Sequence, residues 1–201
     1  MRHRAAWLWV IAVAVTAVDG CTIAPIAAGS LPTTGSGELP PPGYGTLLQR
    51  EISISLVSQD LQILVTPLDE SVIRLTAPDT YRRLSSMANA SARGVAGDRF
   101  LISFYSDQPD VRFVPEEIQL SSGGLRLRPA SITEITPTWG QHRVRQQQQE
   151  TAIYTFADAV NLASDLVLVY GLERTRAWSA ILPRLQAERA RARARSGIGR
   201  R

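Results

Sequence analysis

Alternating apolar and polar side chains mark much of the middle of the chain. Neighbouring side chains alternate in six short runs, at residues 52–56, 61–65, 100–104, 118–120, 125–127 and 153–156. A period of two is typical of strands that bury one face and expose the other. The run at residues 166–170 is apolar throughout, which favours a strand covered on both faces.

Turn residues separate several of these runs. Ser58-Gln59-Asp60 stands between the first two runs, and Ser121-Ser122-Gly123-Gly124 stands between the fourth and the fifth. Each of these pairs of runs is therefore predicted to form a β-hairpin. Short strands separated by turns across residues 49–172 predict an all-β domain, and more narrowly an immunoglobulin-like β-sandwich.

One helical insertion is predicted inside this domain, at residues 78–90. Pro78 suits the first position of a helix, and Asp79 suits the positive end of the helix dipole. The apolar residues that follow share one helical face: Tyr81, Leu84 and Met87 or Ala88. A shorter helical turn is expected at residues 69–75, and a loop at residues 93–98.

The last segment, residues 173–201, has the periodicity of a helix. Its apolar side chains follow the i, i+3, i+4, i+7 spacing of an amphipathic helix, at Trp178, Ile181, Leu182 and Leu185. Pro183 lies inside this pattern, where proline kinks or splits a helix. One kinked helix and two short helices, the second beginning at Pro183, are both compatible with the sequence.

Charge is distributed unevenly along the chain. The formal net charge is +4, and all 22 basic residues are arginine. Residues 173–201 carry 9 Arg against 2 Glu, whereas residues 21–172 carry 11 Arg against 15 acidic residues. The basic character therefore belongs to the C-terminal tail, where Arg and Ala alternate from residue 189 to residue 195. This alternation spreads the charges around a helix axis. The tail is therefore interpreted either as a solvated terminus or as a surface that binds anionic lipid or polymer.

The first twenty residues have the features of an export signal. Arg2 and Arg4 precede an uncharged stretch at residues 5–18. A bilayer span needs roughly 20 apolar residues, so this stretch is too short to cross a membrane and fits the apolar region of a signal peptide. The tetrapeptide Val18-Asp19-Gly20-Cys21 follows it.

This tetrapeptide resembles the lipobox of bacterial lipoproteins. The resemblance covers residues 1–21, and it implies a signal peptide at residues 1–20, cleavage before Cys21 and a lipid on the sulfur of Cys21. The sequence contains 1 Cys, and an exported thiol with no disulfide partner would be consumed by such a lipid. Ordinary secretion and an uncleaved membrane anchor are the alternatives.

A tether is predicted between this anchor and the domain, at residues 21–48. The segment is rich in Pro and Gly, and Glu38 is its one charged residue, so it offers too little apolar surface to fold. The run Pro40-Pro41-Pro42 favours a locally stiff polyproline II conformation. The segment is interpreted either as a spacer that holds the domain off the membrane or as an unstructured N-terminus with no role.

Few residues offer catalytic or metal-binding chemistry. His142 is the one histidine after the leader, and no Gly-x-Ser-x-Gly motif supplies a nucleophile for it, so an exposed histidine is favoured. The adjacent acids Glu116-Glu117 would point to opposite faces of a strand. Asp107 and Asp110 lack the spacing of a calcium-binding loop. The turn at residues 121–124 does not match a phosphate-binding loop.

These features predict a lipid-anchored protein of the cell envelope, attached to a membrane through Cys21 at the periplasmic face of the outer membrane or at the cell surface. We expect a non-enzymatic binding or structural module with an envelope protein as partner. No cofactor, metal or nucleic acid is expected. One alternative is a binder of anionic lipid or polymer through residues 184–201, and a weaker one is a periplasmic hydrolase that uses His142 or the acids.

Overall fold

The computed structural model describes residues 39–91 and 96–198. The predicted signal peptide at residues 1–20, the predicted lipidation site Cys21 and most of the predicted tether lie outside these residues. Half of the loop expected at residues 93–98, namely residues 93–95, lies outside them too.

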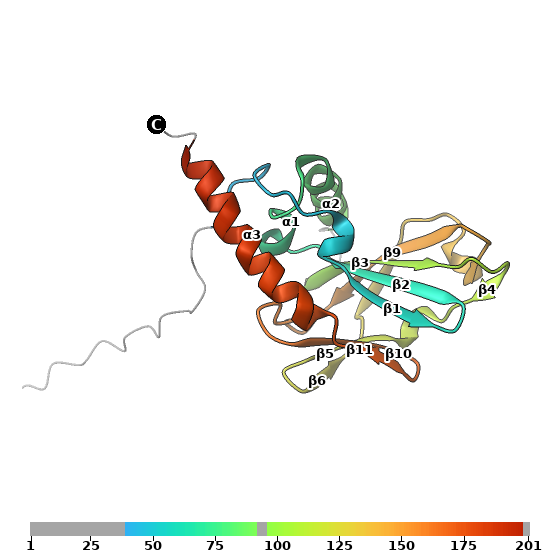
Figure 1. Ribbon diagram of the computed structural model, residues 1–201. Coiled ribbons are helices and arrows are strands. Elements are labelled where there is room, and N and C mark those ends of the chain that lie inside the picture. The colour runs from blue at the N-terminus through green and yellow to red at the C-terminus, as the bar shows by residue number, and fades with distance from the viewer. Residues whose placement is uncertain (1–38, 92–95, 199–201) are drawn as a thin grey trace, which may run out of the picture. The chain divides into compact units, whose positions relative to one another are not determined.

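In the described residues, antiparallel strands build two larger sheets and one small sheet (Figure 1). The five-stranded sheet has the order β1 (Ile54–Ser58), β2 (Leu61–Pro67), β3 (Asp98–Tyr105), β9 (Gln149–Phe156) and β7 (Ser131–Glu134). The four-stranded sheet has the order β11 (Glu173–Thr175), β10 (Leu166–Tyr170), β5 (Ile118–Ser122) and β6 (Leu125–Leu127). The two-stranded sheet pairs β4 (Val111–Arg112) with β8 (Arg143–Val144). The predicted β-rich class is confirmed.

Both predicted hairpins are present. The β1–β2 hairpin turns through Gln59-Asp60, and the β5–β6 hairpin turns through Gly123-Gly124. Gln59, Gly123 and Gly124 have φ values of 52°, 57° and 83°. Tight two-residue hairpin turns need such left-handed values, so the turn residues fix where each pair of strands reverses direction.

Apolar side chains of the two larger sheets meet in one core. Five of its aromatic side chains contact one another and are called the aromatic cluster here: Phe104, Phe113, Trp139, Tyr154 and Tyr170. The ring of Phe104, from β3, stacks on that of Phe113 with centroids 4.5 Å apart. This cluster joins the five-stranded sheet, the four-stranded sheet and the loops near β4 and β8.

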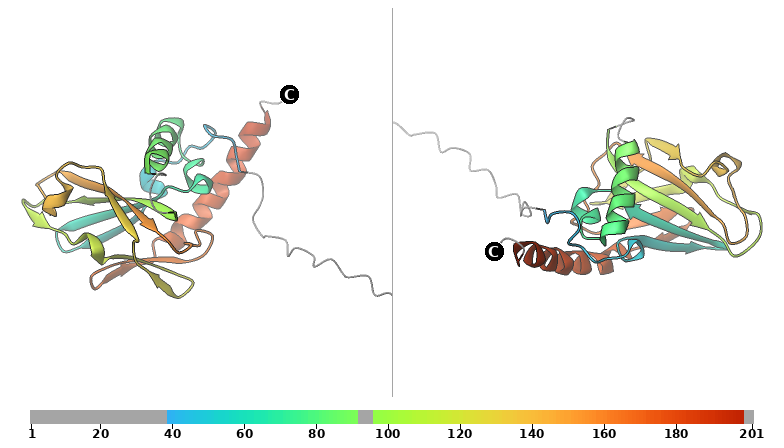
Figure 2. Two further views of the ribbon diagram at one scale, coloured as in Figure 1. Left: turned by 180° about the vertical axis from the view of Figure 1, so that it is seen from behind. Right: turned by 90° about the horizontal axis from the view of Figure 1, so that it is seen from above.

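The helical insertion lies between β2 and β3, as predicted. It consists of α1 (Glu70–Ile73) and α2 (Pro78–Ala90). Asp69 caps α1 by accepting a hydrogen bond from the Ser71 amide at 2.8 Å. Leu84 and Ala88 are buried on the inner face of α2. In Figures 1 and 2, α2 lies over one end of the five-stranded sheet.

The C-terminal segment forms one continuous helix, α3 (Trp178–Ile198), with Pro183 inside it. Of the two alternatives left by the sequence, the structure shows the single helix, and it runs on through the Arg-Ala repeat. Pro183 lies in the second turn, where its missing N–H removes one hydrogen bond, to the carbonyl of Ser179. The buried positions of α3 are spaced by three or four residues, at Trp178, Ile181, Leu185, Glu188 and Ala192. No helix in the described part of the chain is long and apolar enough to cross a membrane.

Residues 39–48 pack against the rest of the described unit, although their composition assigns them to the tether. The Leu47 side chain is buried, and its amide donates to the carbonyl of Leu75 at 3.1 Å. Gly45 lies so close to the Leu75–Thr76 backbone that an added Cβ would come within 2.1 Å of the Leu75 carbonyl carbon. Only glycine permits this close approach, so the ordered unit begins earlier than residue 49.

A buried carboxylate on α3 fastens this N-terminal segment. The Glu188 side chain is 1% exposed. Its Oε1 accepts hydrogen bonds from the Thr46 amide at 3.0 Å and from the Thr46 hydroxyl at 2.9 Å. Arg195 pairs with the same carboxylate and also donates to the Tyr44 carbonyl at 2.8 Å. The C-terminal helix and residues 44–46 are therefore held together by one acid and one arginine.

Candidate binding site

His142 lies in an exposed loop between the 3-10 helix before it and β8. It follows a short 3-10 helix (Trp139–Gln141), has a left-handed φ of 53° and is exposed. Its ring lies 5.8 Å from that of Phe113. Among the described residues, no side chain hydrogen-bonds to the imidazole, so the structure does not bring it together with a serine or an acid.

The other acids singled out by the sequence do not gather into one cluster in the described residues. Glu116 and Glu117 belong to a 3-10 helix (Pro115–Glu117) rather than to a strand, and both are exposed. Asp107 accepts a hydrogen bond from the Tyr105 hydroxyl at 2.7 Å, whereas Asp110 pairs with Arg143. Within the described ranges, no three histidines, cysteines or acids gather in a way that could hold a metal ion.

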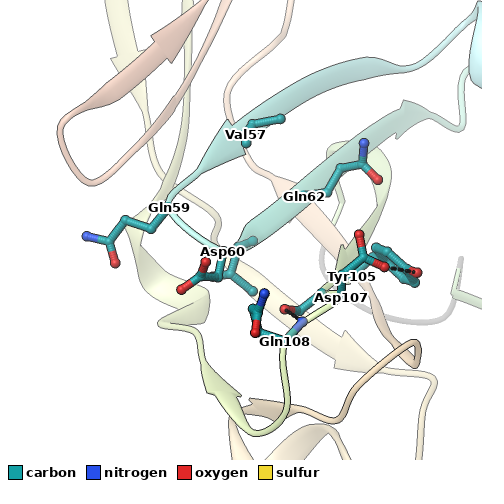
Figure 3. A pocket seen from close by; sticks show the side chains of 9 residues that line it. Val57, Gln59, Asp60, Gln62, Tyr105, Asp107 and Gln108 are labelled. Atoms are coloured by element: carbon teal, nitrogen blue, oxygen red, sulfur yellow. Dashed lines mark hydrogen bonds between the residues drawn. The ribbon is translucent and has the colours of Figure 1, made fainter.

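Two hollows flank the β1–β2 turn at one end of the sheets. The first encloses about 280 Å³ and is shown in Figure 3. Its lining comes from the β1–β2 hairpin and from the end of β3 with the residues after it: Val57, Gln59, Asp60, Leu61, Gln62, Tyr105, Ser106, Asp107 and Gln108. In Figure 3 the side chain of Gln59 points away from the other labelled side chains. The lining of this hollow therefore combines neutral amides, a phenol and carboxylates with the apolar side chains of Val57 and Leu61.

The second hollow lies between the same turn and the four-stranded sheet. It encloses about 320 Å³ and reaches Arg112, Glu117 and the β10–β11 turn. Gly171 and Leu172 form that turn, and Gly171 has a φ of 56°. Leu172 is 97% exposed at the rim of the hollow. Single exposed apolar side chains are common on protein surfaces, and the Leu172 side chain has nearly all of its surface free for a partner to cover.

The charges around the two hollows are mainly negative. Four carboxylates line them, at Asp60, Asp107, Glu117 and Glu173. Arg112 is the cationic side chain among these lining residues. We call the two hollows with the β1–β2 and β10–β11 turns the loop-end site. It has the chemistry to bind a cationic group next to an apolar one.

Two tyrosines of the aromatic cluster hold the 3-10 helix beside this site in place. The Tyr154 hydroxyl donates to the Pro115 carbonyl at 3.0 Å, and the Tyr170 hydroxyl accepts from the Val114 amide at 3.0 Å. Burial raises the pKa of Tyr154 far above its ordinary value and also raises the pKa of Tyr170. Both phenols therefore stay neutral in the folded protein.

We expect the free energy of unfolding to fall as the pH rises above about 10. The unfolded chain releases its phenolic protons near pH 10, whereas the folded chain holds those of Tyr154 and Tyr170 to higher pH. The stability contribution is therefore complete below pH 10 and is lost as the pH rises toward the folded pKa values, by at most about 1.4 kcal/mol per pH unit for each tyrosine. Urea unfolding between pH 8 and pH 11.5 measures this decline.

Tyr154→Phe should make the alkaline decline shallower, because phenylalanine has no proton to release. The exposed Tyr44 is the matched control, since Tyr44→Phe should leave the slope unchanged. Equal slopes for Tyr154→Phe and the parent chain would contradict the expectation.

Sequence reasoning missed two buried acids, Glu150 and Glu188. Glu150, on β9, is 2% exposed, and its Oε1 accepts from the Thr138 hydroxyl at 2.6 Å. Its Oε2 is buried and has no hydrogen-bond partner in the described part of the chain. The position of Glu188 continues the buried spacing of Ile181 and Leu185, so helical periodicity carried past Leu185 would have placed it inward. The period of two through Phe156, Tyr154 and Ala152 likewise continues back to Glu150, so carrying the strand pattern further would have placed it inward.

No protein-family model and no curated protein sequence matches this chain. Among solved structures, one similar chain is MPT63, a secreted protein from Mycobacterium tuberculosis whose crystal structure is known at 1.5 Å resolution. The two chains are 12% identical, the match covers 65% of this chain and 94% of that one, and the TM-score is 0.33. A similarity at this level carries no argument about function.

Proposed function

We propose that this protein is a lipid-anchored, non-enzymatic binding module of the bacterial cell envelope, which binds an envelope protein at the loop-end site. The proposal includes acylation of Cys21, a location at the periplasmic face of the outer membrane or at the cell surface, and an immunoglobulin-like sandwich, in which loops at one end commonly form the recognition surface. The residues between Cys21 and residue 39 allow a reach of at most about 60 Å from the anchor, at roughly 3.3 Å per residue.

The observation that carries this proposal is Leu172. At 97% exposure it adds almost no apolar burial to the fold, whereas full burial of a leucine in an interface is worth about 1.5–3 kcal/mol. Glu173 and Asp60 lie in the same hollow. Carboxylates at the rim of an apolar contact favour partners with basic groups and speed their association. We therefore expect the partner to present an apolar side chain flanked by lysine or arginine.

Photo-crosslinking in the native envelope tests the site. A photoreactive amino acid in place of Leu172 should give a discrete adduct, and the same residue in place of Leu125, which is 69% exposed at the other hairpin, should not. The pair of changes Asp60→Asn and Glu173→Gln should reduce the yield of that adduct about tenfold, because they remove the charge that selects the partner. Two results would refute binding of the partner at the loop-end site. One is equal adduct yield at both positions, and the other is a yield that does not change when Asp60 and Glu173 are replaced.

Mass spectrometry of the mature protein tests the anchor. The expected N-terminal residue is Cys21 carrying acyl chains, and Cys21→Ser should release the protein from the membrane fraction. A mature protein that begins after Cys21 without added acyl mass would show that the chain is not a lipoprotein.

The tail alternative receives less support from the structure. Arg191 and Arg195 pair with Glu188, and Arg189 donates to the Ser71 carbonyl at 3.2 Å. These arginines interact within the described unit, so they are less available to an anionic lipid or polymer. The hydrolase alternative also receives no support, because no acid among the described residues hydrogen-bonds to the His142 imidazole.

A further inference from the structure

A groove on the outer face of the five-stranded sheet has a different chemistry from the loop-end site. It encloses about 450 Å³, within the roughly 300–1,000 Å³ typical of small-molecule sites. One wall comes from α2 and the 3-10 helix η1 (Gln49–Glu51), the floor from β2, β3 and β9, and the far wall from the residues after β7. The lining residues are Leu48, Gln49, Arg50, Leu64, Arg83, Met87, Leu101, Ile135, Thr136, Gln149 and Thr151.

Apolar side chains occupy much of this lining and are incompletely covered. Leu48 is 43% exposed and Ile135 is 40% exposed. Both belong to the few large apolar side chains that the described unit leaves exposed. Leu64 and Met87 are half-buried between them, and Leu101 is buried in the floor. These side chains make a strip that an aliphatic chain can cover, and covering it removes apolar surface from water.

Two arginines stand at the α2 side of the groove without acidic partners. In the described part of the chain, neither Arg50 nor Arg83 forms a salt bridge, and Arg83 donates a hydrogen bond to the neutral amide of Gln49. By contrast, the neighbouring Arg82 pairs with Asp79. No carboxylate lines the groove. The lining residues therefore carry a net positive charge, in a domain whose residues 21–172 carry more acids than arginines. The acid of the η1 wall, Glu51, accepts a hydrogen bond from the Leu48 amide at 2.8 Å.

We infer that this groove binds a single amphiphile with an aliphatic chain and an anionic head, such as a fatty acid or an alkyl phosphate. The head lies at Arg50 and Arg83, which offer charge-assisted hydrogen bonds to carboxylate or phosphate oxygens. The chain lies against Leu64, Met87 and Ile135. This ligand class follows from the pairing of unpartnered guanidinium groups with an uncovered apolar strip, and it does not depend on the loop-end proposal.

The two methionines of the chain make a selective test possible. Labelling the methionine methyl groups with ¹³C gives a signal from Met87, which Met87→Leu identifies by its disappearance. Dodecanoate added to the full-length protein below its micelle concentration should shift the Met87 signal and saturate at one molecule per chain. Dodecyltrimethylammonium, which has the same chain and the opposite charge, should bind at least tenfold more weakly.

Substitutions in the groove should separate the contributions of head and chain. The pair Arg50→Gln and Arg83→Gln should weaken dodecanoate binding by ~10- to 100-fold, the equivalent of one or two charged hydrogen bonds. Ile135→Ser should weaken it about fivefold, because part of the apolar contact is lost. Arg126→Gln, at an exposed arginine of β6, should leave the affinity unchanged and is the matched control for charge.

Three outcomes would overturn the inference. The first is a Met87 signal that does not move with dodecanoate while the fold is intact. The second is equal binding of the cationic and anionic amphiphiles. The third is binding to vesicles of anionic phospholipid that is lost when Arg50 and Arg83 are replaced, while monomeric dodecanoate leaves the Met87 signal unchanged. In that case the arginines would contact a membrane surface rather than a bound amphiphile.

Discussion

Replacing Phe104 by alanine is expected to lower the free energy of unfolding by about 3–5 kcal/mol, the largest effect of any single change considered for this chain. The Phe104 side chain is completely buried. Its ring lies 4.5 Å from that of Phe113, 5.7 Å from Trp139 and 5.8 Å from Tyr170, measured between centroids. Truncation would remove these contacts and leave a cavity where the two larger sheets meet the β4–β8 region.

Urea denaturation followed by tryptophan fluorescence measures this loss. Phe104→Leu keeps most of the apolar volume, so it should cost clearly less than Phe104→Ala. Leu125→Ala, at a position that is 69% exposed, should change stability by less than about 0.5 kcal/mol. A cost below about 1.5 kcal/mol for Phe104→Ala would mean that the aromatic cluster does not hold the sheets together.

Replacing Glu188 by alanine is expected to cost about 2–4 kcal/mol of stability. The carboxylate is almost fully buried and meets the Thr46 amide, the Thr46 hydroxyl and Arg195. Without it, the Thr46 donors lose their acceptor and Arg195 loses its counter-charge, and unmade hydrogen bonds of this kind cost about 1–3 kcal/mol each when buried. Each lost hydrogen bond should cost an amount near the lower end of this range of about 1–3 kcal/mol, because Thr46 and Arg195 are partly exposed.

Glu188→Gln separates charge from hydrogen bonding, because its amide oxygen still accepts from Thr46. It should cost about half as much as Glu188→Ala. The exposed Glu173 is the control, and Glu173→Ala should have little effect on stability. Hydrogen exchange of the Thr46 amide gives a local measure, and unchanged protection in Glu188→Ala would argue against the contact between α3 and residues 44–46.

The strands were predictable wherever local pattern and turn chemistry agreed. The β1–β2 and β5–β6 hairpins follow from alternating side chains around residues that tolerate left-handed φ values. The helix α2 follows from Pro78 at its first position and from the spacing of Leu84 and Ala88. By contrast, β7 was missed because its four residues, Ser131–Glu134, are only partly buried or exposed, so no period of two marks them.

The packing of residues 39–48 was not predictable from composition. Pro and Gly are typical of unfolded linkers, but Gly45 also permits the close approach of two backbones, and Leu47 supplies an apolar anchor. Whether such a segment folds depends on long-range partners, here Leu75 and Glu188. Sequence spacing says nothing about such partners, since Thr46 and Glu188 lie 142 positions apart.

The candidate sites depend on the same kind of long-range assembly. Motif reasoning examined His142, Glu116 and Asp110 singly, and in the described residues no hydrogen bond or ion pair joins their side chains to one another. The loop-end site combines Asp60, Leu172 and other residues from turns that are distant in sequence. No single turn has a distinctive motif, so only the pairing of strands reveals that these side chains share one end of the molecule.

The attachment of residues 44–47 to α3 and to Leu75 also determines how the unit would respond to mechanical force. A pull transmitted through the residues before position 39 would reach the Thr46–Glu188 and Leu47–Leu75 hydrogen bonds before it reached any strand of the sheets. These hydrogen bonds would break first, and the few residues that they hold would then extend in the direction of the pull. The segment would thus detach before the β-sheets unfold and would relieve part of the force on them.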